Sequence, residues 1–150
     1  MNKDIIKKTT EELLNKMTFE GEVFMDGLEE ENILLVNIET HQPNFLIGQA
    51  GANLDALQHI VRILVGRKTD DDTHFLLDVN NYRRNRIDLL REMAKNIAEQ
   101  ALLKKVAVTL QPMPAYERRI IHLVLSDNSQ ISTESIGIEG ERKVIVKPIL

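Results

Sequence analysis

The sequence has no cysteine and no long hydrophobic run. Without cysteine, the chain can form neither a disulfide nor a thiolate metal site, and it has no cysteine nucleophile. A membrane-spanning helix needs roughly 18 apolar residues in succession, and no stretch of this chain approaches that length. The first residues also lack the unbroken apolar segment of a secretory signal. These absences predict a cytoplasmic protein that does not insert into a membrane.

Charge is distributed unevenly along a chain whose composition is otherwise typical of a folded protein. Its 150 residues, 43% hydrophobic and 28% charged, are enough for one ordinary domain or two very small ones. Residues 1–79 include 15 acidic and 7 basic side chains, a net charge of −8. Residues 80–150 include 8 acidic and 12 basic side chains, a net charge of +4. We therefore expect a polyanion to contact the C-terminal half first.

Hydrophobic periodicity and turn residues divide the chain into two series of elements. The first series reads α-β-β-α-α-β, with a helix at 3–17, strands at 22–28 and 33–40, a helical turn at 44–47, a long helix through 54–65 and a strand at 73–79. The second reads α-β-α-β-β, with helices at 82–105 and 115–125 and strands at 106–110, 131–138 and 142–148. This pattern predicts an α+β fold with two domains, residues 1–80 and 81–150.

The first motif is the loop Gly48-Gln49-Ala50-Gly51, between two expected helical segments. Glycines at both ends let the backbone approach a phosphate chain, and the N–H groups that begin the following helix then face the anion. The alternative is a tight turn between helices, in which glycine supplies an unusual backbone angle. Because the loop is expected on the surface, changing Gly48 and Gly51 to Asp should repel phosphates and leave folding intact.

The second motif places Arg118 and His122 four residues apart, so that both share one face of a helix. On an exposed face, the arginine can bind a phosphate bidentately, while the imidazole donates a hydrogen bond or stacks on a base. The adjacent Arg119 is a further candidate contact. The alternative is a solvated helix face on which Arg118 forms an ordinary ion pair with Glu117.

A third feature is a cluster of arginines in the first turns of the helix at 82–105: Arg83, Arg84, Arg86 and Arg91. Cations at a helix N-terminus oppose the helix dipole, and such clusters commonly contact phosphates. We count Arg83 and Arg84 among the candidate nucleic-acid contacts. The alternative is a solvated face that Asp88 and Glu92 partly neutralise.

Catalytic chemistry has little support in the sequence. Asp70-Asp71-Asp72 with His74 offers metal-ligand residue types, which makes a metal-dependent nuclease a distant alternative. We find no convincing carboxylate pair, no nucleophile beside a base and no nucleotide-binding phosphate loop. The sequence therefore predicts no enzyme, no catalytic residue, no metal site and no cofactor.

Together, the motifs and the order of elements resemble known nucleic-acid-binding domains. The first series, with its glycine loop, resembles a type II KH domain. The Arg-x-x-x-His helix and the hairpin that ends at Lys147-Pro148 resemble the R-3-H domain, which binds single strands. The two in succession, joined by Asp78-Val79-Asn80-Asn81-Tyr82-Arg83, resemble the bacterial Jag/KhpB family over about residues 20–148.

This resemblance implies a binder of single-stranded RNA, with single-stranded DNA as a further ligand, that acts as an RNA chaperone or post-transcriptional regulator linked to cell elongation and envelope homeostasis. It also implies a homodimer, or a heterodimer with a small KH protein. KH loops usually carry a basic residue between the glycines, whereas Gln49 and Ala50 stand here. The rival hypothesis is an assembly adaptor that dimerises through its KH half, with RNA binding incidental. Many family members have an additional N-terminal domain, whose function we expect to be absent or supplied otherwise.

Overall fold

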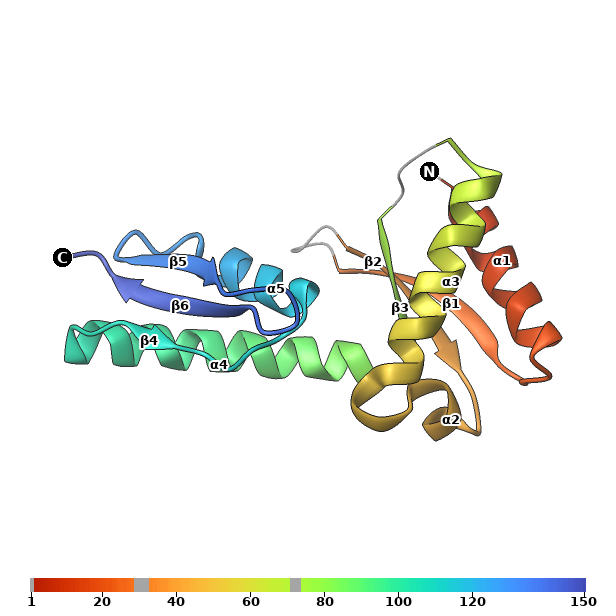
Figure 1. Cartoon of the computed structure of the whole chain (residues 1–150), viewed down its shortest axis with the longest axis horizontal. Coiled ribbons are helices and arrows are strands. Elements are labelled where there is room, and N and C mark those ends of the chain that lie inside the picture. Colours follow the sequence, from red (N-terminus) through yellow and green to blue (C-terminus); the bar gives the residue numbers. More distant parts are fainter. Residues whose placement is uncertain (1, 29–32, 71–73) are drawn as a thin grey trace. The chain divides into compact units, whose positions relative to one another are not determined.

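The computed structural model describes residues 2–28, 33–70 and 74–150 of the chain. The chain divides into two compact units, Met1–Arg83 and Arg84–Leu150. Each unit combines helices with a three-stranded sheet, which confirms the predicted α+β class (Figure 1). Within the described residues, we find no helix with the length and apolar character that a membrane crossing requires.

The first unit has the predicted α-β-β-α-α-β order. Its elements are α1 (Lys3–Lys16), β1 (Glu22–Leu28), β2 (Ile33–Glu39), α2 (Pro43–Ile47), α3 (Ala52–Lys68) and β3 (Phe75–Val79). The central strand, β2, pairs antiparallel with β1 and parallel with β3. Thr73, where we predicted the third strand to begin, lies outside the described residues. This KH-like arrangement leaves the glycine loop between α2 and α3.

The core of the first unit lies between its sheet and the helices α1 and α3, which pack side by side (Figure 1). Along α3, apolar side chains recur at intervals of three and four residues, so one stripe of the helix faces the core. That stripe consists of Leu54, Leu57, Val61 and Val65. It packs in the same cluster as Val36 and Ile38 of β2, both fully buried. The core therefore fixes α3, and with it the loop that precedes the helix.

The second unit is built on one long and one short helix. Its elements are α4 (Tyr82–Lys104), whose first two residues belong to the first unit, β4 (Val108–Thr109), α5 (Ala115–Leu125), β5 (Ile131–Ile136) and β6 (Lys143–Pro148). The middle strand, β6, pairs antiparallel with both β4 and β5. The buried stripe of α4 matches the predicted periodicity and consists of Ile87, Leu90, Ala94, Ala98 and Ala101.

Helix α5 packs against β5 and β6 through its apolar face. Ile120, Ile121 and Leu125 are buried on that face, and Val144 and Val146 are buried on β6. A helix begins after Pro114 because proline fixes its own backbone angle and has no N–H to leave unpaired. With Ile120 and Ile121 turned inward, Arg118 and His122 are directed toward β5.

Candidate nucleic-acid interface

Arg118 is held at the start of α5 by uncharged acceptors. Its Nε donates to the carbonyl of Met113 at 3.2 Å, and its Nη1 lies 3.4 Å from the hydroxyl of Ser135 on β5. The alternative ion pair with Glu117 is absent, because Glu117 instead accepts from Arg86 at 3.0 and 3.4 Å. Within the described ranges, Arg118 forms no ion pair with any carboxylate. Its charge is therefore oriented but not neutralised.

His122 connects α5 to β5 through both ring nitrogens. Nδ1 lies 2.6 Å from the hydroxyl of Thr133, and Nε2 lies 3.0 Å from the hydroxyl of Ser135. A neutral imidazole donates through one nitrogen and accepts through the other, and a hydroxyl can take either role. The pKa of His122 is lowered from its usual value, first by partial burial and second by the nearby charge of Arg118. His122 therefore favours the neutral form and fixes the position of Ser135.

Three residues of this face were not among the sequence-predicted site residues: Thr133, Ser135 and Arg142. Arg142 donates from Nη1 to the carbonyl of Gly137 at 3.2 Å and from Nη2 to that of Ser135 at 3.4 Å. Ser135 thus contacts Arg118 and His122 through its hydroxyl and Arg142 through its carbonyl. Hydroxyl residues two apart on a strand share one face, which is the sequence signal that could have indicated Thr133 and Ser135. Arg119 is exposed on α5.

The glycine loop is shaped by positive backbone angles and by close neighbours. Gly48 has φ 72°, and a Cβ there would lie 2.6 Å from Cγ of Asn53, whose amide nitrogen donates to the carbonyl of Phe45 at 2.8 Å. Gly51 is buried at φ 79°, and a Cβ there would lie 3.4 Å from the ring of Tyr82. Replacing both glycines by Asp would strain the backbone and displace Asn53. Contrary to the prediction from the sequence, we therefore expect this double substitution to destabilise the fold.

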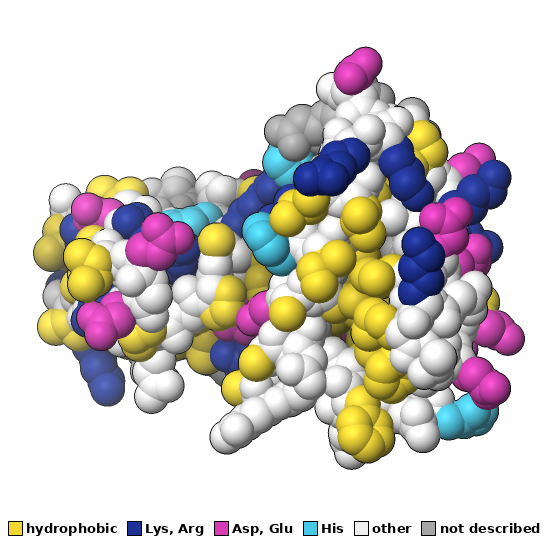
Figure 2. Space-filling view, turned by 45° about the vertical axis from the view of Figure 1, so that its right-hand side comes forward, with side chains coloured by type: hydrophobic (Ala, Val, Ile, Leu, Met, Phe, Trp, Pro, Cys, Tyr) yellow, Lys and Arg dark blue, Asp and Glu magenta, His cyan; other side chains and the backbone are white. Residues whose placement is uncertain are grey.

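Between the glycines, Gln49 and Ala50 are exposed, and Ala50 adopts a left-handed backbone with φ 53°. Phe45, three residues before the loop, has a side chain that is 67% exposed. Hydrophobic side chains also gather on one surface of the first unit (Figure 2). On α3, Ile60 and Ile63 are 44% and 45% exposed. The loop thus combines accessible backbone with apolar neighbours but has no cation between its glycines.

The structure separates the members of the arginine cluster. Arg83 is only 4% exposed and forms an ion pair with Asp55. Its Nη1 also donates to the side-chain oxygen of Gln58 at 3.2 Å and to the carbonyl of Leu77 at 2.9 Å. Arg83 therefore ties α3 to β3 and the start of α4, and it offers little surface to a ligand.

The other arginines of the cluster are distributed along α4. Arg84 is half-buried. Arg86 holds the buried carboxylate of Glu117, as described above, and Arg91 pairs with Asp88 at 3.1 Å. The pair with Asp88 is the partial neutralisation of the arginine cluster that the sequence allowed.

The alternative of a metal-dependent nuclease rested on Asp70, Asp71, Asp72 and His74. Asp71 and Asp72 lie outside the described residues, and the described ranges contain no cluster of three potential metal ligands.

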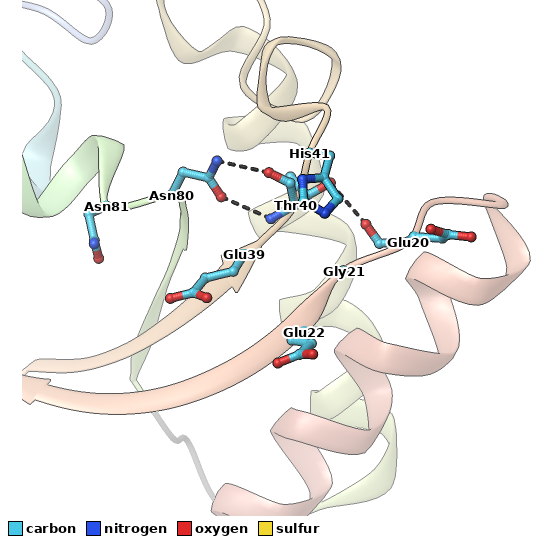
Figure 3. Close-up of a pocket in the computed structure, with 8 residues that line it drawn as sticks. All are labelled: Glu20, Gly21, Glu22, Glu39, Thr40, His41, Asn80 and Asn81. Atoms are coloured by element: carbon cyan, nitrogen blue, oxygen red, sulfur yellow. Dashed lines mark hydrogen bonds between the residues drawn. The ribbon is translucent and has the colours of Figure 1, made fainter.

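A cavity of about 550 Å³ opens at one end of the first sheet and is acidic (Figure 3). Its lining includes three glutamates, Glu20, Glu22 and Glu39. Glu22 and Glu39 are direct partners in the β1–β2 register, so their carboxylates lie on the same face. Beside them, Asn80 exchanges two hydrogen bonds of 2.9 Å with the backbone of Thr40. This end of the unit repels phosphate, unlike the α5–β5 face.

Known proteins are similar to this chain in sequence, both in its second unit and over most of its length. A family model described as the R-3-H domain matches residues 88–148. The RNA-binding protein KhpB of Clostridium symbiosum is 36% identical over 136 residues, which cover 91% of this chain and 61% of that protein. KhpB of Bacillus subtilis is 35% identical over 120 residues, 79% of this chain and 57% of that protein. KhpB of Lactiplantibacillus plantarum is 32% identical over 111 residues, which cover 74% of this chain and 34% of that protein.

The chain therefore spans less than two thirds of the length of each of these relatives. The similarity nevertheless extends over most of the chain and is not confined to the segment with the Arg-x-x-x-His helix. The helices and strands also follow one another in the order that the sequence predicted. On these grounds the chain is similar to the KhpB proteins of the Jag/KhpB family over most of its length.

Proposed function

We propose that this protein binds single-stranded RNA, and that the α5–β5 face with Arg118, Arg119 and His122 is the primary contact. The observation that carries the proposal is the oriented guanidinium of Arg118, which has no carboxylate partner in the described part of the chain. An oriented guanidinium without a carboxylate partner can bind a phosphate bidentately, through two parallel N–H···O hydrogen bonds. RNA is the preferred polyanion because the relatives are named RNA-binding proteins, and single-stranded DNA is the secondary ligand.

In this proposal, the KH-like domain adds a second, short-range contact. The exposed backbone of Gln49 and Ala50 would approach the phosphate chain, and the exposed ring of Phe45 would receive a base. The first unit has 15 acidic and 8 basic residues, a net charge of −7, so it does not attract RNA from a distance. Its contacts act only after the second unit, with a net charge of +3, has captured the strand.

The similarity to the Jag/KhpB family extends the proposal to a cytoplasmic RNA chaperone or post-transcriptional regulator, linked to cell elongation and envelope homeostasis. It also extends to a dimer with a second copy or with a small KH protein. The second candidate function, an assembly adaptor, is favoured by the exposed apolar side chains of α3, Ile60 and Ile63. An adaptor would dimerise through the KH-like unit whether or not RNA is bound.

Fluorescence anisotropy with a short labelled RNA tests the proposal. Arg118→Gln is compared with Lys95→Gln, which removes the same charge from an exposed position on α4. Arg118→Gln should weaken binding and lower the slope of log affinity against log salt by about 0.7, the contribution of one phosphate contact on a single strand. Lys95→Gln should change neither appreciably. Equal affinities and slopes for the two variants would refute the proposed interface.

A further inference from the structure

A second cavity, of about 420 Å³, lies between the start of α5 and the turn of the β5–β6 hairpin. It is lined by Pro112, Met113, Pro114, Ala115, Arg118, Glu139, Gly140 and Arg142. Cavities that hold small organic ligands range from about 300 to 1,000 Å³. The cavity is therefore larger than a single phosphate requires and large enough for one nucleotide.

Two arginines line this cavity, Arg118 and Arg142, and the guanidinium group of each is held by hydrogen bonds. Each is fixed by backbone or hydroxyl oxygens, the first by Met113 and Ser135 and the second by Gly137 and Ser135. Across the residues that the structure describes, neither forms an ion pair with a carboxylate. Each terminal nitrogen of a guanidinium has two N–H groups, so donors remain after these bonds are made. The guanidinium groups of Arg118 and Arg142 are thus already held in place, with N–H donors left to bind an anion.

The remaining lining is not that of a simple phosphate site. The segment Pro112-Met113-Pro114 supplies an apolar wall, against which the flat face of a base can pack. Glu139 supplies a carboxylate, which opposes a free phosphate but accepts hydrogen bonds from amino groups. Adenine, cytosine and guanine have an exocyclic amino group, as in the pairing of a carboxylate with cytosine N4, and uracil has none. This combination of residues fits a nucleotide better than an inorganic anion.

We propose that this cavity is the subsite for one nucleotide of the bound strand. The phosphate lies on Arg118 and Arg142, the base packs on Pro112-Met113-Pro114, and the amino group of the base donates to Glu139. The proposal rests on the RNA-binding function assigned above and adds two residues to it, Arg142 as a phosphate contact and Glu139 as a determinant of base preference. The subsite therefore favours an amino-bearing base over uracil.

The test uses the full chain with oligocytidine and oligouridine of equal length. Wild type should bind oligocytidine several-fold more tightly than oligouridine. Arg142→Gln should lose about tenfold in affinity for oligocytidine, as expected for the loss of charge-assisted bonds to a phosphate, whereas Lys95→Gln should lose about twofold at most. Glu139→Gln should reduce the ratio of the two affinities, because a glutamine amide donates to uracil as well as accepting from cytosine.

The possible failures are distinguishable. If Arg118→Gln weakens binding and Arg142→Gln behaves like Lys95→Gln, the subsite is refuted while the proposed function stands. If neither arginine variant weakens binding, the proposed function itself fails. Equal wild-type affinities for the two strands would refute the role of Glu139. Because Arg142 also supports the hairpin, the guanidinium Nε–H resonance of Arg142 is followed in the wild type. A resonance that does not move at saturation with oligocytidine overturns the subsite without any substitution.

Discussion

At the scale of single residues, the lowered pKa of His122 decides how this side chain can act. Partial burial, with a further effect of Arg118, makes the folded chain bind a proton less readily than the unfolded chain does. The contribution of neutral His122 to stability is therefore complete above the unfolded pKa of about 6.5 and is lost as the pH falls below it. In the chain without RNA, His122 is therefore a neutral residue that fixes Ser135, and we expect it to meet RNA as a hydrogen-bonding group and not as a cation.

We predict that His122→Gln destabilises the protein at pH 7.5, because the two hydrogen bonds to β5 are altered, and that the difference from wild type narrows at pH 5.5. Thermal unfolding of wild type and variant at both pH values measures this difference in stability. RNA affinity of the wild type should not rise between pH 7.5 and 6.5 through this residue. A stability difference that stays constant with pH, or an affinity that rises on mild acidification in wild type but not in the variant, would contradict the assignment.

Arg83 shows why a residue type alone does not define an interface. Its guanidinium donates hydrogen bonds to the side-chain oxygen of Gln58 and to the carbonyl of Leu77. Both acceptors lose this donor in Arg83→Ala. We predict a loss of about 1–3 kcal/mol in the free energy of unfolding, because the buried carbonyl of Leu77 loses a charged donor and the side-chain oxygen of Gln58 keeps only the N–H of Leu77. Arg62→Ala, at an exposed position on α3, should cost about 0.5 kcal/mol or less. Chemical denaturation distinguishes the two, and equal losses would show that the buried network is not stabilising.

At the scale of elements, the sequence indicated most of the architecture. The strand at 22–28 and the helix at 115–125 match β1 and α5, because their boundaries are marked by turn residues and by proline. The fourth strand is shorter than the predicted 106–110, since its register with β6 consists of Val108 and Thr109, followed by a single backbone hydrogen bond from Leu110 to Val144. Local patterns could not reveal that Arg83 is buried, or that Arg142 lines the same cavity as Arg118. Both results depend on how segments distant in the sequence pack together.

The loop between α2 and α3 offers the most direct test of the KH-like unit. Gln49 is exposed between two glycines that cannot be changed without strain, so its side chain can be exchanged while the loop is retained. We predict that Gln49→Lys raises RNA affinity by about fivefold and that Gln49→Glu lowers it similarly, because one charge is added beside the phosphate chain. Both variants should unfold at the wild-type temperature. Identical RNA affinities for the two would show that the loop does not contact RNA.

At the scale of the whole molecule, the two units carry opposite net charge, and the acidic cavity of Figure 3 adds to the repulsion of RNA. We predict that Glu22→Gln combined with Glu39→Gln accelerates RNA association at low salt. Stopped-flow mixing measures this, with 1 M salt as the control, because the screening length there is only about 3 Å. An acceleration that persists at 1 M salt would indicate a local contact and not the overall charge. No acceleration at low salt would contradict the proposed role of net charge.

The central claim is that single-stranded RNA lies on the α5–β5 face of the second unit. The measurement that tests it most directly is a ¹⁵N nuclear magnetic resonance titration of the full chain with a short single-stranded RNA. We predict that the largest shifts fall on the backbone amides of residues 113–119 and 133–142, with smaller shifts at residues 48–51. Saturable shifts that spare residues 113–119 and 133–142 and fall elsewhere in the chain would contradict it.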